Sequence, residues 1–247
     1  MPPVRIGTVD LPERIERDRY FQELSYLELS ALFAGPLKPS ALTRWQTSAP
    51  PHTLGLVAPW VLTQRKPPKA DRLWSHDASV GDFRDSAPGR TALTALGEAV
   101  TAVTAAHAIF KSPPLFAPST ANREQLRRFF SEVATPEAVG AARVWVPDGL
   151  WEPRAAVKFS SELGVTCAFD PLVHDPNTPA EVYEDLGAPA LYFRLSGLGG
   201  PINDERLEDL AALVEHYQDI ELTVVFASST RWQDARNFKK LLEDAAS

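Results

Sequence analysis

The hydrophobic and polar positions repeat one pattern along the whole chain. A short run of Val, Ile, Leu and Phe ends at a polar or turn residue, and a longer Ala-, Leu- and Glu-rich segment follows. The clearest copy joins the apolar run 190–195, a glycine-rich turn, the segment 203–217 and the next run at 221–226. Strands that alternate with helices predict a parallel sheet. About eight such copies predict an α/β fold, a single-domain TIM-type (β/α)8 barrel spanning 1–247.

The same pattern predicts where each element lies. Strands are expected at 4–8, 26–32, 53–58, 108–110, 142–146, 165–169, 190–195 and 222–226. Helices are expected at 18–24, 39–47, 91–105, 122–134, 153–163, 179–186, 203–217 and 231–244. Asn203 is a favourable N-cap, and the acidic Asp204 and Glu205 that follow suit the positive end of the helix dipole.

Residues 64–90 interrupt the repeat and make the expected barrel irregular. This stretch contains Pro67-Pro68 and scattered charges, and its apolar residues show no period. Loops of this length in a compact domain usually have a function or lack order. We expect a long loop or lid after the third strand, part of which packs down through Trp74 and Phe83.

Composition narrows the class of protein. The chain has 247 residues, close to the size of one TIM barrel. Its formal net charge of −7 and its dispersed basic residues argue against a nucleic-acid partner. It has no apolar stretch of the roughly 18 residues that would span a membrane, so we expect a cytoplasmic protein without a membrane partner. Cys167 is its single cysteine, which excludes an intrachain disulfide and a thiolate-rich metal site.

Charged residues near strand ends are the candidates for chemistry, because catalytic groups of this fold come from there. The candidate catalytic residues are Glu28, Asp170, Arg194 and Lys111. Glu28 is flanked by apolar Leu27 and Leu29, so its side chain points to the opposite face. A carboxylate inside the barrel needs a cationic partner, which Arg194 or Lys111 could supply. An acid/base role and a structural ion pair are equally compatible with this pattern.

A glycine-rich turn after the seventh strand and small hydroxyls after the eighth suggest a ligand site. TIM barrels often hold phosphate with backbone amides at these two loops, although such glycines can also simply form a tight turn. The candidate ligand-binding residues are Ser196, Gly197, Gly199, Gly200, Ser228, Ser229, His174 and Asn237. Asp170, His174 and Asp175 lie close together, but Asp-Pro commonly opens a turn and the histidines show no paired spacing. We therefore expect no metal and no cofactor.

Several segments resemble one family in the same order along nearly the whole chain. They are Ile6-Gly7-Thr8, Leu27-Glu28-Leu29, residues 33–45, Ala58-Pro59, Pro113-Pro114-Leu115-Phe116, Trp151, Asp170, Arg194-Leu195-Ser196-Gly197 and Ala235-Arg236-Asn237. On these segments the chain is similar to the YecE-like family, domain of unknown function 72. The resemblance implies a single-domain TIM barrel and leaves the biochemical role open.

The chain departs from the family pattern at polar positions. Val57, Trp60 and Gln64 stand where the family has a lysine, an arginine and a histidine, and Ser196 replaces another histidine. Trp145, Pro147 and Asp148 replace a Glu-x-Arg-His group. The resemblance therefore implies a divergent member that has lost much of the family's polar inventory.

Three functions remain open at this point. The first is binding of a small anionic or polar ligand, such as a sugar phosphate or nucleotide, at the C-terminal mouth of the barrel, with weakened or absent catalysis. The alternative is an active lyase, isomerase or hydrolase on a sugar or phosphoester, with Glu28 or Asp170 as the base. The last is a non-catalytic scaffold that uses the 64–90 loop, with Trp60 and Trp74 forming an exposed apolar patch.

Overall fold

The computed structural model describes residues 4–68, 74–148, 151–173, 183 and 186–245. Eight parallel strands close into a barrel in the order of the sequence. They are β1 (Arg5–Val9), β2 (Tyr26–Leu29), β3 (Leu54–Val57), β4 (His107–Lys111), β5 (Ala142–Val146), β6 (Thr166–Phe169), β7 (Ala190–Leu195) and β8 (Glu221–Phe226). The predicted TIM-type (β/α)8 barrel is confirmed.

Helices follow the strands, as the repeat predicted. The α-helices are α1 (Arg17–Glu23), α2 (Ala31–Ala34), α3 (Pro39–Ser48), α4 (Trp60–Thr63), α5 (Ala87–Val103), α6 (Thr120–Arg128), α7 (Pro136–Val139), α8 (Pro153–Glu162), α9 (Asp204–His216) and α10 (Arg231–Ala245). A π-helical turn, η1 (Phe129–Val133), continues α6, and a 3-10 turn, η3 (Gly197–Gly199), follows β7. Among the described residues, no helix is long and apolar enough to cross a membrane.

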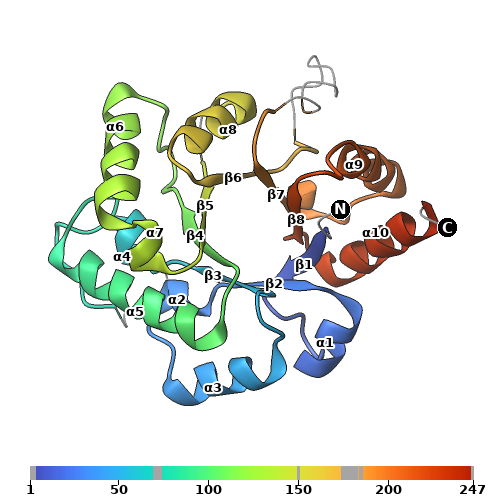
Figure 1. Ribbon diagram of the computed structural model, residues 1–247, viewed down its shortest axis with the longest axis horizontal. Helices are drawn as coiled ribbons and strands as arrows, with labels where there is room; N and C mark the ends of the chain where they lie inside the picture. Colours follow the sequence, from blue (N-terminus) through green and yellow to red (C-terminus); the bar gives the residue numbers. More distant parts are fainter. Residues whose placement is uncertain (1–3, 69–73, 149–150, 174–182, 184–185, 246–247) are drawn as a thin grey trace. The chain divides into compact units, whose positions relative to one another are not determined.

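The chain divides into two compact units, and both boundaries fall within strands, in β2 and β6. Unit 1 comprises residues 1–28 and 168–247. In it β1 pairs with β2 and with β8, and β7 pairs with β6 and with β8. Helix α10 packs on β1, β8 and α9, as Figure 1 shows. The expectation of a single domain over 1–247 stays a prediction.

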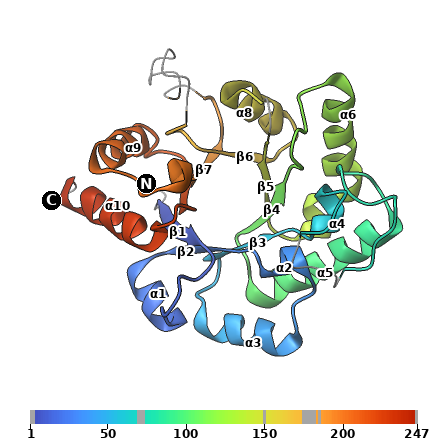
Figure 2. The ribbon, with the colours of Figure 1, turned by 180° about the vertical axis from the view of Figure 1, so that it is seen from behind.

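Unit 2 comprises residues 29–167. Strands β3, β4 and β5 pair in order, and β5 continues to β6. Helix α5 contacts β3 and β4 as well as helices α3 and α7, and Figure 2 shows α3 and α5 side by side. A cluster of buried aromatic rings, with neighbouring centroids 5.2–6.2 Å apart, forms part of the core of this unit. Its members are Phe83, Phe110, Phe116, Phe129 and Phe130.

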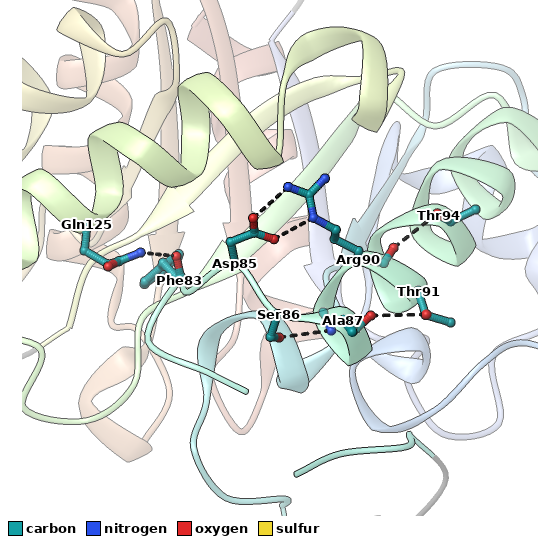
Figure 3. A network of polar contacts seen from close by, with 9 residues as sticks. Phe83, Asp85, Ser86, Ala87, Arg90, Thr91, Thr94 and Gln125 are labelled. Carbon is teal, nitrogen blue, oxygen red and sulfur yellow. Dashed lines mark hydrogen bonds and ion pairs between the residues drawn. The ribbon is translucent and has the colours of Figure 1, made fainter. Parts of the chain in front are cut away.

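The 64–90 segment is not one long free loop: its last residues are helical, and hydrogen bonds anchor the part before them. Its end is helical, because α5 begins at Ala87, where the Ser86 hydroxyl accepts the Gly89 amide (Figure 3). Gln125 holds the segment from α6, since its side-chain amide donates to the Phe83 carbonyl at 2.6 Å. Trp74 is buried and donates its indole N–H to the Leu32 carbonyl at 3.1 Å. The expected packing of Trp74 and Phe83 is present.

Three further element predictions need correction or fall outside the described chain. The second strand ends at Leu29 instead of continuing to residue 32, because Ala31–Ala34 forms a helical turn that buries Leu32. The helix expected over 122–134 ends at Arg128, where the backbone changes to the π-helical η1. The helix expected over 179–186 lies outside the described residues, apart from Tyr183 and Leu186.

Candidate functional site

The centre of the candidate site in unit 1 is an ion pair between Glu28 of β2 and Arg194 of β7. The Arg194 Nε lies 3.2 Å from both Glu28 carboxylate oxygens, and its Nη2 lies 3.1 Å from Oε1. Glu28 is fully buried, whereas the Arg194 side chain is 18% exposed. Strands β1 and β8 separate β2 from β7 in the sheet, so the two side chains meet across the face that these strands share. Arg194 is therefore the cationic partner that buried Glu28 needs.

Tyrosine hydroxyls complete the surroundings of the carboxylate. Tyr192 donates its hydroxyl proton to Glu28 Oε2 at 3.0 Å, and its oxygen lies 3.4 Å from that of Tyr26. Burial raises the pKa of the Tyr26 and Tyr192 phenols above their ordinary value, so both stay protonated and able to donate. Sequence reasoning missed both tyrosines. Each lies two positions before its charged neighbour, and the period of two along a strand puts them on the same face.

The guanidinium of Arg194 is held as a cation. Burial lowers its pKa, but the Glu28 carboxylate more than offsets this effect and the pKa is raised on balance. Glu28 engages Nε and Nη2. In the part of the chain that the structure describes, no hydrogen bond or ion pair is seen at Nη1. A guanidinium oriented in this way can offer charge-assisted hydrogen bonds to an anion.

Asp170 and Ser196 link the ends of β6 and β7. The Ser196 amide and hydroxyl donate to Asp170 Oδ2 at 2.7 and 2.8 Å. The other oxygen, Oδ1, accepts the Leu172 amide at 3.0 Å. The Asp170 carboxylate therefore accepts three hydrogen bonds from the protein, and it joins the start of the loop after β6 to the start of the loop after β7.

The glycine-rich turn after β7 is tightly closed on itself. Gly197 has a φ of +62°, and a Cβ at this position would lie 2.8 Å from the Ser228 Cβ. Only glycine combines this conformation with this close approach. The Gly200 amide donates to the Gly197 carbonyl at 3.0 Å, so it is used inside the turn that also contains Gly199. This geometry favours the tight-turn interpretation over a phosphate cradle at Gly200.

The hydroxyls after β8 are engaged by a carboxylate of the chain itself. Ser228 and Thr230 both donate to Oδ2 of Asp234, a buried residue in the first turns of α10. Sequence reasoning missed Asp234, although an acidic residue four positions after a threonine at a helix start is the signal that could have found it. Ser229 is exposed in the same loop.

The remaining predicted site residues lie elsewhere. Asn237 is exposed along α10, and its side-chain oxygen accepts the Gln233 amide at 2.7 Å. Lys111 belongs to unit 2, where its carbonyl accepts the Gln64 side-chain amide at 2.9 Å and its ammonium lies 6.0 Å from the centre of the Phe33 ring. His174 lies outside the described residues.

Other residues singled out by the sequence are buried. The exposed tryptophan patch expected for a scaffold is wrong, because Trp60 and Trp74 are 0% and 7% exposed and pack within unit 2. Cys167 is buried, and burial raises the pKa of its thiol, which suits a core residue better than a nucleophile. Within the described ranges, no group of three or more His, Cys, Asp and Glu side chains could hold a metal ion.

Solved structures with the same fold cover nearly the whole chain. A DUF72 family protein from Enterococcus faecalis V583 is 14% identical, with a TM-score of 0.70 over 98% of this chain and 96% of that one. A DUF72 family protein from Thermotoga maritima MSB8 is 15% identical, with a TM-score of 0.60 over 96% and 99%. D-allulose 3-epimerase from Methylomonas sp. is 12% identical, with a TM-score of 0.59 over 100% and 98%.

Identities this low establish a shared fold and leave activity open. Neither a protein-family model nor a curated protein matches the sequence. The resemblance expected from the sequence motifs is supported by two solved structures, and the chain is a TIM barrel with the fold of the DUF72 family proteins.

Proposed function

We propose that this protein binds a small anionic or polar ligand at the C-terminal ends of β2 and β7, with weak or absent catalysis. The observation that carries the proposal is that Arg194 is held in place by Glu28 and is still partly exposed. Buried Glu28 holds two of its nitrogens, while the side chain keeps 18% of its surface exposed. A guanidinium fixed in advance loses little freedom when it receives a carboxylate or phosphate, which favours binding.

The surroundings of the two carboxylates support binding over catalysis. A general base must reach the proton it removes with a free oxygen. Glu28 is fully buried, and its oxygens accept from Arg194 and Tyr192. Asp170 accepts three hydrogen bonds from the protein. Both carboxylates therefore suit a positioning role, Glu28 for Arg194 and Asp170 for the loops after β6 and β7.

The test is a thermal-shift screen followed by calorimetric titration. The probes are inorganic phosphate, a hexose phosphate, a nucleoside monophosphate and D-allulose, the sugar bound by a protein of this fold. A ligand at about 100 times its dissociation constant should stabilise the protein by about 2.7 kcal/mol. We expect a phosphorylated probe to raise the melting temperature and the neutral sugar to have a smaller effect.

Matched variants locate the binding site. Arg194→Lys keeps the charge that Glu28 needs but loses the planar fork, so it should weaken binding by about tenfold. Arg90→Gln is the control, because Arg90 forms an exposed pair with Asp85 in unit 2. Absence of any shift at millimolar probe, or equal affinity in both variants, contradicts the proposal. Turnover of a probe would favour the alternative, an active lyase, isomerase or hydrolase with Glu28 or Asp170 as the base.

A further inference from the structure

A cavity lies in unit 2, at the loops that follow β3 and β4. Its volume is about 540 Å³, which is within the range of small-molecule sites. It is lined by the polar residues Gln64, Arg65, Lys66, Asp82 and Asn122 and by residues 113–116. All of these residues belong to unit 2, whereas Glu28 and Arg194 belong to unit 1.

Two residues of this cavity have left-handed backbone conformations. Asp82 has a φ of 51° and Leu115 a φ of 64°; aspartate tolerates this region, whereas a bulky residue such as leucine rarely adopts it. Hydrogen bonds keep Asp82 in place: its amide donates to the Thr63 carbonyl at 3.0 Å, and the preceding Gly81 amide donates to the Val61 carbonyl at 2.8 Å. Such strain in an ordered segment is typical of binding sites.

The strained Leu115 is also 86% exposed. Its side chain therefore gains no burial in return for the backbone conformation, and it stands next to Pro114 and Phe116 at the edge of the cavity. An exposed leucine alone is ordinary, but an exposed leucine in a left-handed conformation beside a cavity offers an apolar contact to a ligand.

The charge among the lining residues is unbalanced. The Arg65 guanidinium pairs with the Asp82 carboxylate. Lys66 is exposed, and no residue of the described part of the chain forms a hydrogen bond or ion pair with its ammonium. The cavity thus combines one uncompensated positive charge with an apolar wall.

We propose that this cavity binds a small organic anion, a carboxylate, sulfonate or phosphate carried on an apolar group. Lys66 attracts the anionic group, and the apolar group lies against Leu115 and Pro114. The Arg65–Asp82 pair limits the net charge of the site to that of Lys66, so a singly charged group fits it best.

Two fluorescent probes separate the charged and apolar parts of this recognition. Anilinonaphthalene sulfonate has both parts, and phenylnaphthylamine is its neutral parent. We expect saturable binding of the sulfonate. Lys66→Gln should weaken it by about tenfold, the worth of one charge-assisted hydrogen bond, and leave the neutral probe unchanged. Lys158→Gln is the control, because Lys158 is an exposed lysine on α8.

Two further variants test the opposite charge and the apolar wall. Asp82→Asn removes the partner of Arg65 while keeping a residue that tolerates the left-handed conformation, so the sulfonate should bind more tightly. Leu115→Gly relieves the backbone strain and removes the apolar contact, so both probes should bind several-fold more weakly without loss of thermal stability.

Clear results would overturn the proposal. These are no saturable binding to the wild type, the same sulfonate affinity for Lys66→Gln and Lys158→Gln, or unchanged binding of both probes to Leu115→Gly. Inorganic phosphate serves as a competitor. A carboxylate with an aromatic ring is the second competitor. If the two compete equally strongly with the sulfonate probe, the site binds the anion alone and the apolar part of the proposal is wrong.

Discussion

The Arg194 side chain of β7 lies against the Glu28 carboxylate of β2, with its Nε 3.2 Å from both carboxylate oxygens. Strands β1 and β8 lie between β2 and β7 in the sheet, and the two residues are 166 positions apart in the chain. A buried charge is tolerated only when a partner compensates the loss of water. The pair therefore couples the orientation of a candidate ligand contact to the stability of unit 1.

Removing the charge of Glu28 should destabilise the protein strongly. Glu28→Gln leaves the Arg194 guanidinium largely buried without its counter-ion, and we expect the free energy of unfolding to fall by about 3–5 kcal/mol. Denaturant unfolding measures this change. Asp85→Asn is the matched control, because its pair with Arg90 (Figure 3) is exposed, and water screens an exposed pair so that it contributes little to stability. Similar losses in the two variants would show that burial of the Glu28 pair has no energetic consequence.

The buried tyrosines should make the protein sensitive to alkali. Burial raises the pKa of Tyr20, Tyr26 and Tyr192 in the folded state, whereas the unfolded value is about 10. Their contribution to stability is therefore complete below about pH 10 and is lost as the pH rises further. Each of these buried tyrosines should lower the free energy of unfolding by about 1.4 kcal/mol for every pH unit above pH 10.

Tyrosinate absorbance together with denaturant unfolding checks this dependence. Tyr20, Tyr26 and Tyr192 should ionise only when the protein unfolds. Tyr192→Phe should reduce the slope of stability against pH above pH 10 by the share of one tyrosine. Ionisation of all tyrosines in a still-folded protein is the result that would contradict the assignment.

The loop after β8 should depend on Asp234 for stability and contribute little to binding. Asp234→Ala leaves the buried Ser228 hydroxyl without its acceptor, so we expect a loss of about 2 kcal/mol in the free energy of unfolding. Ser228→Ala should cost about 1 kcal/mol and leave phosphate affinity unchanged, because its hydroxyl is already engaged. Weaker phosphate binding by Ser228→Ala would return this loop to the ligand site.

Two buried tryptophans should respond differently to substitution by phenylalanine. The indole N–H of Trp74 donates to the Leu32 carbonyl, whereas that of Trp60 is buried and has no hydrogen-bond partner among the described residues. Trp74→Phe loses packing and a hydrogen bond, and Trp60→Phe loses packing alone. We expect Trp74→Phe to be the more destabilising by about 1 kcal/mol, measured by thermal or denaturant unfolding. Equal losses would indicate that the Trp74 hydrogen bond adds nothing to stability.

Strand and helix positions could be predicted because they depend on local periodicity. The bounds expected for β5 and β7 agree with the structure, and Asn203 caps α9 by accepting the Arg206 amide at 3.0 Å. The π-helical η1 could not be predicted, because it continues the apolar spacing of α6 and differs only in its hydrogen bonding.

The candidate site was predicted only in part. The face of Glu28 followed from its apolar neighbours, and the need for a cationic partner followed from burial, but Arg194 and Lys111 were equally compatible with the sequence. The role of Ser228 was also open, because the sequence does not show whether its hydroxyl is free to bind a ligand or donates to Asp234. The left-handed backbone of Leu115 has no signal in residue type, since leucine disfavours it.

The sequence by itself determined the repeat of strands and helices and the face on which Glu28 lies, since both depend on neighbours a few positions away. Only the tertiary structure decided that Arg194 pairs with Glu28, that Asp234 engages the hydroxyls after β8, and that Lys66 and Leu115 border one cavity. The physical reason is that a contact between distant segments is stabilised by burial and charge at the place where they meet, and local periodicity carries no record of that place.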